Sequence, residues 1–200
     1  MKKIFYVLFV LGLILVFLPF FIVIAFLEAF LSGFPIIFTQ KRTGLNGKPF
    51  FIYKFRTMRT DAEMKQKALT KYNEADGPVF KIRNDPRFTG VGKFLAHTGL
   101  DELPQLCNIL RGDMTLIGLR PLPVPEAAKL KSWQKERQKI KPGIISPWIL
   151  EGYHTQTFDA WMKSDIAYAT KKSIPYDLVL AGRTVVFLIG LFVREISPRD

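Results

Sequence analysis

Asp101 and Glu102 are adjacent acids just before an apolar run with helical spacing, in a chain with only 17 Asp and Glu among 200 residues. An aspartate at the start of a helix is most simply an N-cap that accepts backbone N–H bonds. The same place suits phosphate chemistry, because free N–H groups and the positive end of the helix dipole attract anions and keep a carboxylate ionised and nucleophilic. Mg²⁺ between acids and phosphates would relieve the repulsion between the two carboxylates. The pair therefore indicates a helix cap or a nucleophile that attacks phosphorus.

Basic residues that suit phosphate oxygens lie in two places: Lys54 and Arg56 in an expected hairpin, and Arg120 before a rigid proline-rich segment. Each of them alone is most simply a solvated surface cation. The whole chain carries 29 Lys and Arg and a formal charge of +12, so it attracts polyanions such as nucleic acid, anionic lipid and phosphate-rich small molecules. No motif typical of nucleic-acid binding accompanies the charge, and we expect no nucleic-acid partner.

Cysteine and histidine usage excludes two other kinds of site. Cys107 is the single cysteine, so the chain has no internal disulfide. His97 and His154 are far apart in sequence with no second Cys or His beside either, which argues against zinc.

The N-terminal segment is apolar from Ile4 to Phe38, with Glu28 as its single charge. As one straight helix it would be about 50 Å long, against a hydrocarbon core of about 30 Å. Pro19 near its middle favours a break, and lysine or arginine flanks both ends, which favours the cytoplasmic side for both. We therefore expect a re-entrant membrane helix broken at Pro19. A single tilted span and a cleaved signal peptide are the alternatives.

The remaining elements predict an α/β fold with more helix than sheet. Asn46-Gly47 is typical of a hairpin turn between strands at 36–38 and 50–55. We expect a further strand over 79–82, a surface helix or a mobile excursion over 60–75, a short helix or turn over 91–96 and a basic helix over 126–140. Two last helices are expected over 158–169 and 178–193, and the second of them is nearly all apolar. Another helix should begin at Asp101, with Leu103, Leu106, Cys107 and Leu110 on one face, and end at Arg111-Gly112. The last apolar helix is expected to pack in the core or to lie on the bilayer.

Four segments carry a resemblance to a known family. They are FTQKRTGLNGKPFFIYKFRTM (38–58), GPVFKIRNDPRFTGVGKFL (77–95), LDELPQLCNILRGDMTLIGLRP (100–121) and KPGI (141–144). In this order they resemble the bacterial sugar transferases, the monotopic polyprenyl-phosphate phosphoglycosyl transferases. The resemblance covers nearly all of 36–196, and the anchor agrees in length and in the position of its proline.

The resemblance implies a function that residue patterns alone do not. Asp101 would attack the β-phosphate of a UDP-sugar, releasing UMP, and polyprenyl phosphate would then take the sugar-phosphate. Glu102 would assist beside it and Mg²⁺, bound at Asp101, would be required. Lys54, Arg120 and Asp165 match positions that line the site. It also implies a re-entrant anchor over 1–38, amphipathic interfacial helices, and a catalytic domain over 39–200 on the cytoplasmic face of the bacterial inner membrane. A homodimer is left open.

The chain departs from the family pattern at several positions. Leu18 stands where serine usually precedes the anchor proline, and Lys2-Lys3 replaces a longer charged motif. His97 and Tyr153 stand in place of arginines, Gly99 in place of a serine, and Leu119 in place of a proline. Loss of two arginines from a phosphate site motivates an alternative: a membrane-bound scaffold or binding protein that kept the fold and lost turnover.

Overall fold

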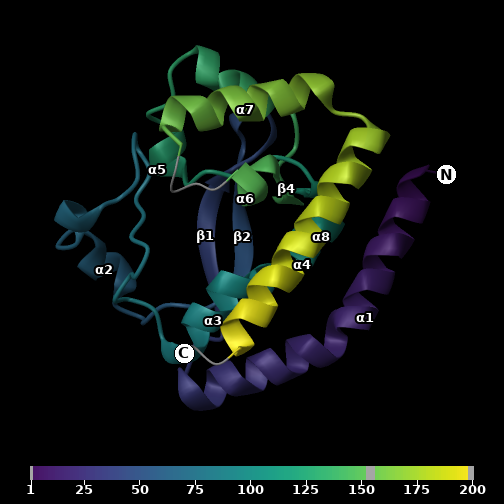
Figure 1. Ribbon diagram of the computed structural model, residues 1–200. Helices are drawn as coiled ribbons and strands as arrows, with labels where there is room; N and C mark the ends of the chain where they lie inside the picture. Colours follow the sequence, from purple (N-terminus) through teal and green to yellow (C-terminus); the bar gives the residue numbers. More distant parts are fainter. Residues whose placement is uncertain (1, 152–155, 198–200) are drawn as a thin grey trace.

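The computed structural model describes residues 2–151 and 156–197, most of which are helical (Figure 1). The expected fold class is confirmed in its coarse form, because helices dominate and two small two-stranded sheets provide the rest. Gly152 and Tyr153 lie outside the described residues.

The hairpin agrees with its local sequence. Strands β1 (Ile37–Thr43) and β2 (Pro49–Phe55) pair antiparallel, and the turn η1 (Leu45–Gly47) joins them. Asn46 and Gly47 have φ values of 54° and 76°, a region that asparagine and glycine tolerate better than other residues. This turn brings the two strands into register with Ile37 opposite Phe55.

Helix α1 (Lys2–Leu31) continues through Pro19, and its axis changes direction between its two halves (Figure 1). Both halves pack on the rest of the protein. Val10 lies in a buried cluster with Ile52 and Leu106, and Ile24 lies in another with Phe55 and Leu95, as the helix runs along the domain. By length and composition α1 could cross a membrane, and so could the C-terminal helix α8 (Ile174–Ile196). Re-entry into a membrane stays a prediction.

The end of α1 is tied to the hairpin by polar contacts. The Arg56 guanidinium donates hydrogen bonds to the carbonyls of Ser32 and Gly33, and the Ser32 hydroxyl lies 3.3 Å from that of Thr89. At the other end of the helix, the Tyr6 hydroxyl accepts a hydrogen bond of 2.8 Å from the backbone N–H of Leu116. Polar bonds thus fix both halves of α1 to the domain.

The helix expected from Asp101 begins later. A 3₁₀ turn, η3 (Leu100–Glu102), follows α3 (Gly90–Thr98), and α4 (Gln105–Arg111) starts only after Pro104. The expected apolar face was wrong as well, because Cys107 and Leu110 are exposed. The buried side chains of α4 are Gln105, Leu106, Asn108 and Ile109. Of the two buried polar residues, Asn108 points inward to bond the backbone of β2.

Asn108 supplies hydrogen-bond partners to that backbone. Its side-chain oxygen accepts from the Tyr53 N–H at 3.0 Å, and its amide donates to the Phe51 carbonyl at 2.6 Å. The residue is fully buried, so neither bond competes with water. Asn108 therefore clamps α4 to β2 and sets where Lys54, the next residue of the strand, lies relative to the turn that carries Asp101.

The rest of the domain covers the hairpin. Strand β3 (Thr115–Ile117) pairs parallel with β4 (Gly143–Ile145). The other elements are α2 (Ala62–Gln66), η2 (Thr70–Tyr72), α5 (Val124–Ala127), η4 (Trp133–Lys139), α6 (Pro147–Glu151), α7 (Phe158–Lys171) and α8. Most apolar side chains of α8, such as Leu178 and Val186, are exposed, which favours the bilayer over the core as its surroundings.

Three predicted elements were wrong for tertiary reasons. Residues 60–75 form only the short helical elements α2 and η2. The helix expected over 126–140 is divided between α5 and η4, and Gln134 and Arg137 of η4 turn inward to bond α7. No strand forms over 79–82. Instead the Asn73 side chain accepts from Lys81 N–H at 2.7 Å and donates to the Val79 carbonyl at 3.0 Å, which replaces a strand partner.

Replacing Asn108 by alanine should lower the free energy of unfolding by about 2–4 kcal/mol, because buried backbone groups of Tyr53 and Phe51 lose their partners. Denaturant unfolding in detergent micelles measures this. Lys163→Ala, at an exposed position on α7, is the control and should change the value by less than about 0.5 kcal/mol. Equal stability of the two variants would contradict the proposed clamp.

Candidate active site

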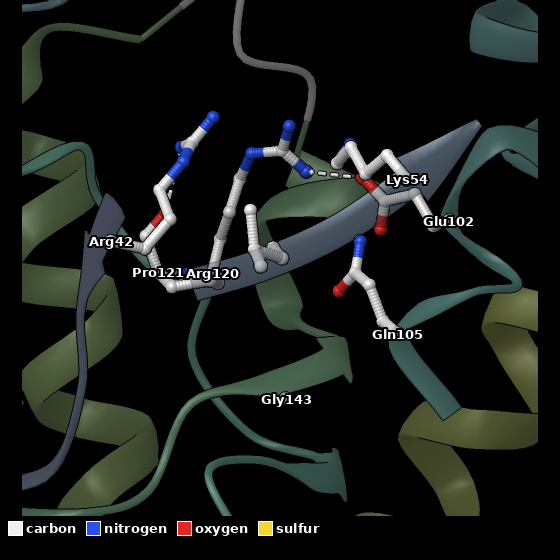
Figure 2. Close-up of a pocket in the computed structure, with 8 residues that line it drawn as sticks. Arg42, Lys54, Glu102, Gln105, Arg120, Pro121 and Gly143 are labelled. Atoms are coloured by element: carbon white, nitrogen blue, oxygen red, sulfur yellow. Dashed lines mark hydrogen bonds and ion pairs between the residues drawn. The ribbon is translucent and has the colours of Figure 1, made fainter. Parts of the chain in front are cut away.

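Three separate segments bring Lys54, Asp101, Glu102 and Arg120 together. Lys54 on β2 places its ammonium nitrogen 3.2 Å from Asp101 Oδ2 and 2.6 Å from Glu102 Oε1. Arg120, in the segment after β3, reaches the same Glu102 oxygen at 3.0 Å (Figure 2). The result is a part-buried cation–carboxylate network between residues far apart in sequence, in which Asp101 is buried.

Asp101 is not a helix cap. Its carboxylate accepts a hydrogen bond from Lys54, and η3 has no side-chain cap. The turn exists because α3 ends at Gly99, whose φ of 73° lies in the left-handed region that glycine tolerates best. Glycine in place of the family's serine therefore suits this corner. The N-cap alternative was wrong, and the carboxylate is available for chemistry.

Burial sets the electrostatics of the two acids. It raises the pKa of Asp101; the Lys54 charge opposes this shift and the Glu102 charge adds to it. Burial also acts to raise the pKa of Glu102, but the charges of Lys54 and Arg120 outweigh it and lower that pKa to about 2. Glu102 is thus firmly anionic at neutral pH. The ionisation of Asp101, which we expected a helix terminus to favour, depends instead on Lys54.

The backbone carbonyl of Arg120 is held by Arg137, which forms an ion pair with Asp165. The Arg137 guanidinium donates to the Arg120 carbonyl at 2.8 Å, and Arg137 itself lies 2.6 Å from Asp165, which is fully buried on α7. Asp165 is therefore not at the surface of the site, where the resemblance placed it. It positions Arg137, which in turn holds the backbone of Arg120.

Arg56 lies apart from the two carboxylates. Its guanidinium bonds to the carbonyls of Ser32 and Gly33 at the end of α1, as described above, and the residue is 5% exposed. The contacts present in the structure make Arg56 a link between β2 and the anchor.

Three residues that sequence reasoning did not single out also face the site. Arg42 donates to the Pro121 carbonyl at 2.9 Å, beside Arg120 (Figure 2). Lys81 and Trp148 line the same cleft as Asp101 and Arg120. Lys81 and Arg42 fall within motifs that carried the family resemblance, but only the folded chain brings them together with Trp148.

The departures at His97 and Leu119 have structural partners. The His97 ring nitrogen Nδ1 lies 3.1 Å from Glu195 Oε1 near the end of α8, so this position links α3 to α8. Leu119 is buried with Tyr168 and Leu180 in an apolar cluster. A leucine there adds core packing where the family has a proline.

The two acids fit a magnesium ion that arrives with a substrate. Their oxygens already converge on one cation, the Lys54 ammonium, and carboxylate oxygens are ligands that Mg²⁺ prefers. Among the described residues, no group of three or more His, Cys, Asp or Glu could hold a metal alone. Two carboxylates suit Mg²⁺ that takes its other ligands from water and phosphates.

The chain is similar to known bacterial sugar transferases. Galactosyl transferase CpsE of Streptococcus agalactiae is 45% identical over 161 residues, which is 80% of this chain and 36% of that protein. Undecaprenyl-phosphate galactose phosphotransferase of Salmonella typhimurium is 34% identical over 76% of this chain and 33% of its own length. The chain thus spans about a third of these two relatives.

A shorter relative is covered more fully. The exopolysaccharide production protein ExoY of Rhizobium meliloti is 32% identical over 176 residues, 86% of this chain and 78% of that protein. The sequence model of the bacterial sugar transferases matches residues 1–190, which include the anchor and all four residues of the charged network. The chain therefore belongs to the bacterial sugar transferase family.

Proposed function

We propose that this protein transfers a sugar-1-phosphate from a UDP-sugar to polyprenyl phosphate through a covalent phosphosugar-aspartate at Asp101. The observation that carries the proposal is the part-buried network in which Asp101 and Glu102 share Lys54 while Arg120 holds Glu102. The names of the relatives, which include an undecaprenyl-phosphate galactose phosphotransferase, support the substrate classes. The product would begin assembly of a glycan such as O-antigen, capsule, exopolysaccharide or a glycoprotein glycan.

The reaction takes two displacements at one phosphorus. An Asp101 carboxylate oxygen attacks the β-phosphorus of the donor, forming a P–O bond while the bond to the α-phosphate oxygen breaks and UMP leaves with that electron pair. An oxygen of polyprenyl phosphate then attacks the same phosphorus. The bond to Asp101 breaks, the carboxylate is regenerated and a diphosphate-linked lipid results.

Each neighbour has a role that follows from its contacts. Burial raises the pKa of Asp101, and the Lys54 charge opposes that rise, which favours the ionised form that a nucleophile needs. Glu102, anionic and held by two cations, positions Lys54 and Arg120. Arg120 presents a planar guanidinium suited to phosphate oxygens. Charges fixed in a buried site stabilise a phosphoryl transition state more strongly than charges in water.

Mg²⁺ completes the proposed site. Asp101 and Glu102 would hold it, and when bound it neutralises charge on the donor diphosphate. The inference rests on the pair of convergent carboxylates described above.

The membrane arrangement is also part of the proposal. Both halves of α1 pack on the domain, from Tyr6 near the start to Ser32 just after the end. A straight span would carry one half away from the domain, so this packing supports a re-entrant anchor at the cytoplasmic face of the inner membrane. UDP-sugars are made in the cytoplasm, and the same face gives access to polyprenyl phosphate.

A screen of UDP-sugars with undecaprenyl phosphate, followed by UMP release, tests the function. The wild type should release UMP with at least one donor. Asp101→Asn should abolish release, because an amide cannot form the phosphosugar intermediate, and Glu102→Gln should cripple it. Asp61→Asn removes an exposed surface acid and should leave turnover unchanged. Near-normal turnover by Asp101→Asn would overturn the mechanism. A wild type inactive with every donor would favour the scaffold alternative.

Removing divalent metal should abolish turnover. We expect no UMP release in EDTA and recovery when Mg²⁺ is added in excess, because two carboxylates beside two phosphates need a cation with hard oxygen ligands. Zn²⁺ should not restore the rate, since the site lacks the nitrogen and sulfur ligands zinc favours. Full activity in EDTA would be incompatible with a metal-dependent site.

Cysteine labelling in intact cells tests the anchor. On a Cys107→Ser background, which removes an exposed thiol, cysteine is introduced separately at Lys3 and at Lys48, both exposed. A membrane-impermeant thiol reagent should label neither in intact cells and both after the inner membrane is permeabilised. Labelling of one site alone in intact cells would show that α1 spans the membrane. The cytoplasmic placement would then have to be abandoned.

A further inference from the structure

Lys81 is fixed in place although it belongs to no helix or strand. Its N–H donates to the Asn73 side chain at 2.7 Å, and its carbonyl accepts from the Glu74 N–H at 2.8 Å. Asn73 also holds the Val79 carbonyl at 3.0 Å. These hydrogen bonds hold the backbone of the segment, from which the Lys81 side chain extends into the cleft.

Trp148 holds Lys81 and Arg120 near each other. The Lys81 ammonium lies 4.8 Å from the centroid of the Trp148 ring, and the Arg120 guanidinium carbon lies 4.4 Å from it. Trp148 itself packs on Trp161, with ring centroids 5.4 Å apart. An aromatic face attracts a cation without neutralising its charge, unlike a carboxylate. The contact thus orders the Lys81 ammonium beside the Arg120 guanidinium.

The electrostatic surroundings of Lys81 favour an incoming anion. Burial lowers its pKa, the charges of Arg120 and Lys54 lower it further, and the result is about 6 despite the opposing Glu102 and Asp101. Without a ligand, these surroundings thus destabilise the charged form of Lys81. A phosphate group beside Lys81 would stabilise the charged form, because it carries the opposite charge.

We propose that Lys81, held over Trp148 beside Arg120, is a phosphate-binding residue of the cleft. The inference rests on the proposed function for the identity of its ligand, which is a phosphate oxygen of the donor diphosphate or of the lipid phosphate. Lys54 serves the nucleophile from β2, whereas Lys81 reaches the cleft from the loop before α3 and from the side of Trp148. The two lysines therefore serve different parts of the reacting complex.

The test is binding to the full-length protein in nanodiscs with Mg²⁺ present. One arm titrates UDP, and the other titrates undecaprenyl phosphate with undecaprenol as the phosphate-free reference. Lys81→Met should weaken at least one phosphate ligand by roughly 10-fold to 100-fold, the range for loss of a hydrogen bond between charged groups. The arm that weakens names the source of the phosphate. Lys163→Met, at an exposed position on α7, is the matched control.

Two further variants separate binding from folding. Lys81→Arg keeps the cation and should retain most of the affinity, and thermal unfolding shows whether Lys81→Met is still folded. Trp148→Leu removes the aromatic support and should weaken the same arm as Lys81→Met. If Lys81→Met binds both phosphate ligands as Lys163→Met does, the assignment is overturned. Binding that is sensitive to Lys81 in a protein that releases no UMP would uphold the assignment and refute the proposed function.

Discussion

Two adjacent carboxylates in a buried turn cannot both stay ionised without cations beside them, and the Lys54 ammonium between Asp101 and Glu102 meets that constraint. Its place depends on the clamp that Asn108 makes between α4 and β2. The position of the second cation, Arg120, depends on the ion pair between Arg137 of η4 and Asp165 of α7. The short strands and the irregular segment after β3 thus serve to hold opposite charges at fixed distances.

The same elements connect this network to α1, which is long and apolar enough to cross a membrane. Ile24 of α1 packs with Leu95 of α3, just before the turn of the two acids, and Val10 packs with Leu106 of α4, just after it. These packing contacts join α1, whose remaining side chains are largely exposed and apolar, to the helices on either side of the charged turn. In the proposed reaction, a lipid phosphate at the membrane surface would be within reach of a nucleophile this close to α1. Interactions that stabilise the fold thereby also set the position of the two acids relative to α1.

Sequence patterns predicted what local chemistry decides. Asn46-Gly47 identified the hairpin, and the helices predicted over 158–169 and 178–193 correspond to α7 and α8. Patterns were wrong where a distant side chain replaced a backbone partner, as at 79–82, where Asn73 takes the place of a strand. The acids of the site stood out by their type and adjacency, whereas Lys54 and Arg120 were placed around them by family resemblance. Lys81 and Trp148 were missed because their meeting is purely tertiary.

Buried charges are also informative about whether the site is used. Burying Asp101 and Asp165 carries a desolvation penalty that paired cations only partly offset, and apolar residues of similar volume often stabilise a fold as well or better. Stability alone therefore gives little reason for two buried acids with their cations in one small domain. A scaffold that had lost turnover would need neither a buried Asp101 whose pKa is raised nor the two cations, Lys81 and Arg120, that lie over the Trp148 ring. The replacement of an arginine by His97 leaves this network whole, because His97 bonds to Glu195 and lies outside it. The cost of burying these charged groups thus favours an enzyme over a binding protein of the same fold.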